Sequence, residues 1–139
     1  VDILVPNETE AGGLTGVAVS EEAPGGREQA AEEAAAILRD WGVETAVITL
    51  GAAGALLVDN AGARRIPAHK VEAVDTTAAG DAFTGGLAAA LIRGLSMDEA
   101  VRYATCAGAL AVTRFGAQPS LPTRREADAL YALGPVGPA

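Results

Sequence analysis

The hydrophobic positions of this chain form short apolar runs separated by longer segments with helical spacing. Val1–Val5 and Val71–Val74 are predicted as short strands. Thr45–Leu50 is apolar and β-branched without polar alternation, which is typical of a strand covered on both faces, as in a parallel sheet. Ala55–Val58 and Arg64–Ile66 flank the sequence DNAG, which favours a hairpin.

Helical patterns fill most of the remaining chain. Three of them begin with a capping box, in which a polar residue is followed three positions later by glutamate: Asn7 and Glu10, Ser96 and Glu99, and Thr123 and Glu126. The other predicted helices are Glu28–Trp41, with Ala30, Ala34, Ile37 and Trp41 on one face, and Asp81–Arg93. Because strands and helices alternate, apart from one hairpin, the sequence predicts an α/β layered domain.

Composition narrows the class of protein. The 139 residues are 50% hydrophobic and 20% charged, which favours one globular domain, here 1–134, followed by a flexible tail at 135–139. The net charge of −8 argues against nucleic acid as a ligand. No apolar run reaches the length of a membrane helix, so no membrane association is expected. The single cysteine, Cys106, excludes an intramolecular disulfide and fits the reducing cytoplasm.

The segment Val74–Gly86, with the sequence VDTTAAGDAFTGG, carries the strongest chemical signal. Small and hydroxyl residues precede a predicted helix, whose first N–H groups, near Ala78, Ala79 and Gly80, can hold an anion. Asp81 follows in the first turn, within reach of a group that attacks a bound phosphate. An anion cradle beside a carboxylate base is what a phosphoryl transferase needs. The alternative is a plain helix start, since acidic residues are common there.

Four segments together resemble the ribokinase family of sugar kinases, the PfkB carbohydrate kinases. DTTAAGD resembles the family signature DTTGAGD, and VPNETEA, VITLGAAGALL and AVTRFGAQPSLP resemble three further family segments in the family's order. The matches extend from about Ile3 to Pro122. The resemblance implies a three-layer α/β/α sheet, of which this chain would be the C-terminal, nucleotide-binding part.

The resemblance also implies roles for individual residues. Asp81 would be the base that takes the proton from the primary hydroxyl of a sugar. The backbone amides of Ala78, Ala79 and Gly80 would form the anion hole for the phosphate in transfer.

Nucleotide contacts are implied in several segments. Asn7 and Glu10 would organise Mg²⁺ and the phosphates through water, although the same pair is also a capping box. Thr49, Gly51 and Gly54 would contact ATP, although the end of an ordinary buried strand has the same pattern.

Cys106 is predicted to be a small packing residue in an Ala-rich helix. The alternative is that Cys106 and Thr105 line an adenine pocket, and Thr105 is kept as a candidate cofactor-binding residue.

A monovalent cation site follows from the resemblance as well. Oxygen ligands drawn from two loops suit K⁺, a hard cation. The implied ligands are the Asp75 side chain, the carbonyls of Thr77, Ala111, Arg114 and Gly116, and the hydroxyl of Ser120. The alternative is that the glycine and prolines of this segment only form turns.

The family's sugar-binding segment, of the type GGKGxNxA, does not occur in this chain. Three interpretations therefore stay open: part of a sugar kinase, a truncated nucleotide-binding relative without activity of its own, or an unrelated α/β domain. The first predicts ATP-dependent phosphorylation of a sugar, with ribose converted to ribose 5-phosphate. ATP and a small sugar would be the partners, and the complete protein would form a homodimer.

Overall fold

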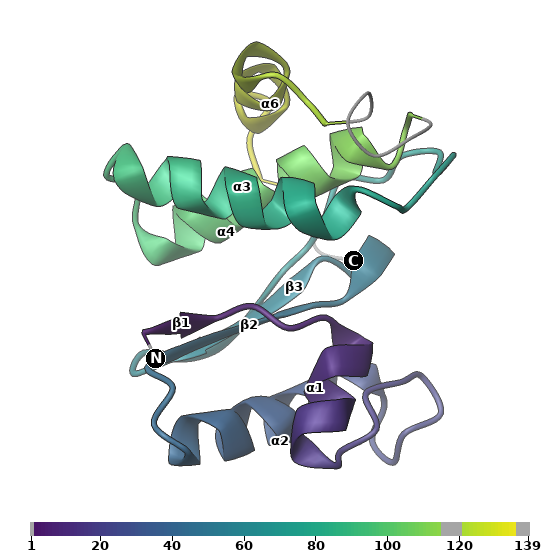
Figure 1. The fold of residues 1–139 in the computed structure, drawn as a ribbon, viewed down its shortest axis with the longest axis vertical. Coiled ribbons are helices and arrows are strands. Elements are labelled where there is room, and N and C mark those ends of the chain that lie inside the picture. The colour runs from purple at the N-terminus through teal and green to yellow at the C-terminus, as the bar shows by residue number, and fades with distance from the viewer. Residues whose placement is uncertain (1, 115–120, 136–139) are drawn as a thin grey trace. The chain divides into compact units, whose positions relative to one another are not determined.

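A computed structural model describes residues 2–114 and 121–135 of the chain (Figure 1). The chain forms two compact units. The first contains Val1–Gly51 and Ala55–Arg65, and the second contains Ala52–Gly54 and Ile66–Ala139. The predicted tail lies outside the described residues, except for Pro135.

The first unit is built on a mixed sheet with the strand order β1-β2-β3-β4. The strands are β1 (Ile3–Leu4), β2 (Thr45–Thr49), β3 (Ala55–Asp59) and β4 (Gly62–Ile66). β1 is parallel to β2, and β2 is antiparallel to β3. β3 and β4 are neighbours in the sheet and consecutive in the chain, which confirms the predicted hairpin. The first strand, β1, is shorter than the predicted Val1–Val5. β2 is buried on both faces, as its apolar run predicted.

Helices α1 (Glu8–Thr15) and α2 (Arg27–Asp40) cover one face of this sheet (Figure 1). The buried stripe of α2 consists mainly of alanines, whose small side chains allow the helix to approach the sheet closely. Its members are Ala30, Ala31, Ala34, Ala35 and Leu38.

The prediction that Trp41 shares the packing face of this helix is wrong. The helix ends at Asp40, and Trp41 is its C-cap residue, at the point where the chain leaves the helix. Gly42 then turns the chain with a φ of 103°. The Trp41 side chain is consequently 62% exposed, whereas Leu38 is buried.

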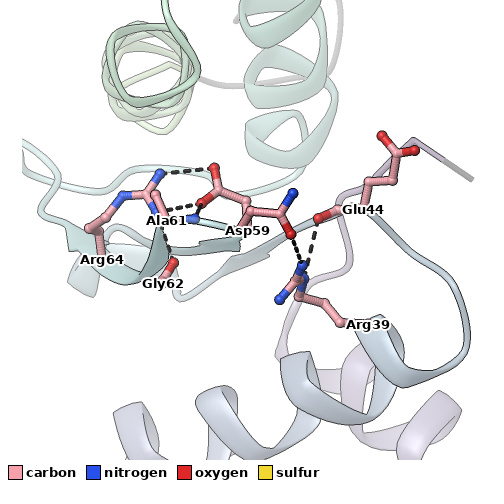
Figure 2. A network of polar contacts seen from close by, with 7 residues as sticks. Arg39, Glu44, Asp59, Ala61, Gly62 and Arg64 are labelled. Atoms are coloured by element: carbon pink, nitrogen blue, oxygen red, sulfur yellow. Dashed lines mark hydrogen bonds and ion pairs between the residues drawn. The ribbon is translucent and has the colours of Figure 1, made fainter.

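A polar network joins the end of α2 to the turn between β3 and β4 (Figure 2). The Arg39 guanidinium donates to the Glu44 carbonyl at 3.3 Å and to the Asn60 side chain at 2.7 Å. In the turn, Arg64 donates to both carboxylate oxygens of Asp59, at 2.6 and 3.0 Å. The hydrogen bonds from Arg64 hold the pKa of Asp59 below its usual value. The network therefore holds the hairpin of β3 and β4 against the end of α2.

The second unit contains α3 (Ala79–Ile92), α4 (Met97–Ala111) and α6 (Arg124–Tyr131). α3 and α4 lie side by side (Figure 1) and meet through small residues. A Cβ on Gly86 would lie 3.0 Å from that of Ala107, so glycine permits the close approach. The predicted helices are confirmed, although α3 starts two residues before Asp81.

The predicted strand at Val71–Val74 is wrong. Among the described residues these four join no strand, and Val74 lies in a bend. The N–H groups of Val74 and Asp75 donate to the carbonyl of Val112, at 2.7 and 3.1 Å. Because these donors bond the end of a helix, they are unavailable for a strand ladder.

The carboxylate of Asp128 ties α6 to both longer helices. It accepts hydrogen bonds from the Tyr103 hydroxyl on α4, at 2.7 Å, and from Arg93 at the end of α3, at 2.9 Å. Arg102 reinforces the contact, because its guanidinium stacks 3.7 Å from the ring centre of Tyr131. The hydroxyl of Tyr103 and the guanidinium of Arg93 lower the pKa of Asp128.

We therefore expect Asp128→Asn to remove part of the acid sensitivity of folding. A carboxyl whose pKa is lower in the folded state contributes stability above about pH 4, its unfolded pKa, and loses it as the pH falls through the folded pKa. Urea midpoints measured from about pH 2.5 to 6 should fall less steeply for the variant than for the wild type. Equal slopes would show that Asp128 does not have this role.

Candidate active site

The candidate residues of the first unit gather at the carboxyl ends of β1 and β2. The Thr49 N–H donates to the Pro6 carbonyl at 3.0 Å, and Asn7, beyond the end of β1, forms a parallel bridge with Thr49, the last residue of β2. In open α/β sheets, ligands bind outside the carboxyl ends of the strands. The structure thus brings together Asn7 and Thr49, two residues predicted to bind the nucleotide, at such an edge.

The capping box of Asn7 and Glu10 is confirmed. The Asn7 side-chain oxygen accepts from the Glu10 N–H at 2.7 Å, and the Glu10 carboxylate accepts from the Asn7 N–H at 2.9 Å. These bonds fix both side chains at the start of α1, where both residues are exposed. Their carbonyl and carboxylate oxygens are the type of ligand that Mg²⁺ prefers. Capping and organisation of a hydrated cation are therefore compatible roles, and the second stays a prediction.

The turn after β2 requires two glycines. Gly51 opens the 3₁₀-helix Gly51–Ala53 with a φ of 58°, and Gly54 closes it with a φ of 95°. A Cβ on Gly54 would lie 2.0 Å from the carbonyl oxygen of Ile66. Gly54 therefore has a structural reason to be glycine, independent of its predicted contact with ATP.

In the second unit, the start of α3 has no side-chain cap. Its N-cap is Ala78, whereas α1, α4 and α6 are capped by polar side chains. The Ala79 N–H donates to the Thr76 carbonyl at 3.2 Å, which differs from the expectation of an open donor there. Gly80 and Asp81 occupy the next two positions, whose N–H groups have no acceptor within a helix. The donors suited to an anion are therefore centred on these two residues.

The space around this helix start is open. Among the described residues, no heavy atom outside the local backbone lies within 4 Å of the position that a Cβ would take on Gly80. Asp81 is exposed in the same turn. A phosphate could approach the backbone at Gly80 with the Asp81 carboxylate beside it, the combination predicted from the sequence.

The predicted cation ligands of the second unit also converge in part. The double hydrogen bond to the Val112 carbonyl brings Asp75 to the end of α4, next to Ala111 and Arg114. The Asp75 carboxylate accepts from the N–H of Thr77 at 2.9 Å and from the Thr77 hydroxyl. Carboxylate and carbonyl oxygens are the ligand types that a hard cation prefers, and the K⁺ site at these residues stays a prediction. Gly116 and Ser120 lie outside the described residues.

Thr105 and Cys106 belong to the buried face of α4. Thr105 is 4% exposed, and its hydroxyl donates to the Arg102 carbonyl at 2.7 Å. Burial raises the pKa of the Cys106 thiol. The packing role predicted for Cys106 is confirmed, and the adenine contact of Thr105 stays a prediction.

The sequence analysis missed one contact of a candidate residue, the ion pair between Arg114 and Glu126. Glu126 was identified only as a capping residue. Its partner lies twelve positions earlier, and no periodic pattern signals a contact over that separation.

The described residues contain no cluster of three or more His, Cys, Asp or Glu side chains placed to hold a metal ion. None of the helices in the described ranges is long and apolar enough to span a membrane.

Comparison with known proteins defines the family. Residues 1–124 match the model of the pfkB family carbohydrate kinases. The chain is 48% identical over 126 residues to ribokinase of Haemophilus influenzae, covering 91% of this chain and 39% of that protein. It is 47% identical over 96 residues to aminoimidazole riboside kinase of Salmonella typhimurium, covering 66% and 30%. The structure of Arabidopsis thaliana ribokinase complexed with ribose and ATP matches with a TM-score of 0.79 at 34% identity, covering 94% and 41%.

The chain therefore belongs to the pfkB family of carbohydrate kinases. The predicted α/β class and ribokinase-like fold are confirmed by the structural match. The chain spans only 30% to 41% of the length of these three relatives.

We expect Gly54→Ala to destabilise the protein by at least about 2 kcal/mol, because a side chain at this φ is strained and its Cβ meets the Ile66 carbonyl. The matched control is Gly13→Ala, at a helical position with nothing within 4 Å of the added Cβ. The control should gain up to about 1 kcal/mol, since alanine favours a helix. Urea unfolding of the intact protein measures both, and similar effects would contradict the close approach.

Proposed function

We propose that this chain is the nucleotide-binding and catalytic part of an ATP-dependent sugar kinase. The reaction would transfer the γ-phosphoryl group of ATP to the primary hydroxyl of ribose and give ribose 5-phosphate and ADP. The start of α3 carries the proposal, because uncapped backbone donors and the Asp81 carboxylate stand in one exposed turn. Membership of the carbohydrate kinase family supports it.

The proposed chemistry needs two groups at this turn. The N–H groups around Gly80 would stabilise the charge on the phosphoryl group during transfer. Asp81 would accept the proton of the sugar hydroxyl as the new O–P bond forms and the bond to ADP breaks. Since phosphoryl transfer is largely dissociative, this proton can move late, and a modest base suffices.

ATP would bind across the residues at the carboxyl ends of β1 and β2. We propose that Thr49 and Gly51 contact its phosphates or ribose, with Gly54 in the same turn. Mg²⁺ would neutralise phosphate charge, and Asn7 and Glu10 would hold it through water, consistent with their exposed position. K⁺ would bind at Asp75, Thr77 and the carbonyls at the end of α4. The complete protein would be cytoplasmic and form a homodimer.

We expect Asp81→Asn to lower kcat by about 10²- to 10⁴-fold, because the base is lost while the backbone donors remain. ATP affinity, measured by calorimetry, should change little. Asp98→Asn is the matched control, since Asp98 occupies the first turn of the neighbouring helix α4. The control should keep the wild-type rate. Near-normal turnover by Asp81→Asn would exclude Asp81 as the base.

The substrate is tested separately, with a panel of ribose, fructose, adenosine and aminoimidazole riboside. Ribose is proposed because ribokinases are among the similar proteins, and the riboside is included because its kinase matches at nearly the same identity. We expect the largest kcat/KM for ribose in a coupled ADP assay of the intact protein. A larger value for another sugar would reassign the substrate and keep the kinase.

A further inference from the structure

In the second unit, helix α3 has an exposed face without charge. No residue between Asp81 and Arg93 is charged, and Ile92 is 86% exposed. Spacings of three and four residues place the exposed residues on one side of the helix. This side, which we call the apolar face of α3, consists of Gly85, Ala88, Ala89 and Ile92. Because a helix that faces water ordinarily carries polar side chains there, the apolar face is suited to a contact and not to solvent.

Helix α2 provides the contrast within the same chain. It has 14 residues, as α3 does. Its exposed positions include Glu28, Glu32 and Glu33, and the exposed Ala36 lies one turn beyond these glutamates. This chain therefore places charged residues where a helix is exposed to water. Their absence from the exposed side of α3 points to a face that is covered.

The sheet of the first unit also lacks a neighbour among the described residues, at the edge formed by β1. β1 is the first strand in the order of the sheet. The carbonyls of Asp2 and Pro6 accept hydrogen bonds from β2, at 2.9 and 3.0 Å. Because backbone groups alternate in direction along a strand, those of Ile3 and Val5 point away from β2. Such an edge can pair with a further strand, which is a second and independent indication of a neighbouring part.

We propose that the apolar face of α3 docks the part of a pfkB kinase domain that lies outside these 139 residues and belongs to the same polypeptide. The relatives have the necessary length, because the chain spans only 39% of the Haemophilus influenzae ribokinase and 41% of the Arabidopsis thaliana ribokinase structure. Glycine and alanine leave room for larger side chains in a closely packed contact. The docking part therefore presents large apolar side chains to α3.

The position of Asp81 gives the docking face a consequence for the active site. Asp81 lies one turn before Gly85, on the same side of α3. The docked part would therefore border the candidate base. This consequence rests on the proposed function, whereas the docking face itself does not.

A second copy of the chain fits this face less well. From Gly85 to Ile92 the face extends about 10 Å along the helix and is about 10 Å wide. The resulting area of roughly 100 Å² is far below the about 800 Å² per partner that a stable interface buries. A segment of the same polypeptide needs no such area, because the linking chain sets its effective concentration.

The test is the rate at which a maleimide labels Ala89→Cys in the native, intact protein. We expect labelling at least about tenfold slower than that of Ala36→Cys, and independent of protein concentration. Ala36→Cys is the matched control, since Ala36 is also an exposed alanine in a 14-residue helix but lies beside the glutamates of α2. Dividing each rate by that of the same variant unfolded in urea removes differences in intrinsic reactivity. The wild type, whose cysteine is buried, gives the background.

The outcomes separate the different occupants of the face. Equal rates for the two variants would overturn the proposal, and so would protection that disappears on dilution, because that would show a second copy. If Ala89→Cys does not fold, Ala88→Cys replaces it.

A cross-linking experiment identifies the occupant directly. Thr84→Cys, at an exposed position next to Gly85, is labelled with a benzophenone maleimide, irradiated and analysed by mass spectrometry. Cross-linked peptides from outside these 139 residues support the proposal, and cross-links confined to them overturn it. Neither measurement requires turnover, so a failure here leaves Asp81→Asn as an independent test of the kinase.

Discussion

The carbonyl of Val112 is the acceptor that fixes the segment leading into α3. Two consecutive N–H groups, from Val74 and Asp75, bond to this one oxygen at the end of α4. These two hydrogen bonds fix the position of the segment that leads into α3. They thereby help to place Asp81 and the uncapped N–H groups at the start of that helix. A helix C-terminus carries partial negative charge, so it attracts these donors and would also attract a cation. One local feature thus helps to place both the start of α3, which is proposed to bind a phosphate, and Asp75, which is proposed to bind a cation.

Local signals in the sequence predicted most elements well. Capping residues such as Asn7 and Thr123 act within one turn, so their helix starts could be placed from the sequence alone. The apolar run of β2 likewise predicted its burial. The predictions of secondary structure were wrong where a residue far away in the sequence supplies the hydrogen-bond partner. Val71–Val74 has the composition of a strand, but the N–H of Val74 donates to the Val112 carbonyl at the end of α4 and not to a neighbouring strand.

The residues of the candidate site also fall into those that local sequence predicts and those that depend on distant partners. The residues of Val74–Gly86 could be predicted because one continuous segment forms the turn and the helix start. The ion pair of Arg114 with Glu126 could not, because both residues also fit ordinary surface roles. Similarly, the sequence marks Gly54 as a turn residue, but only the structure shows the Ile66 carbonyl occupying the place of its side chain. Contacts between separated segments carry information that residue spacing lacks.

The buried thiol of Cys106 has a practical consequence for spectroscopy. It is the only cysteine of the chain, it is buried on α4, and burial raises its pKa, which keeps it protonated at neutral pH. Buried thiols of this kind react slowly with maleimides. A cysteine introduced at the exposed Thr84, one turn beyond Gly80, would therefore take up a fluorophore selectively. The wild-type background already provides a chain in which a single dye can report on the start of α3.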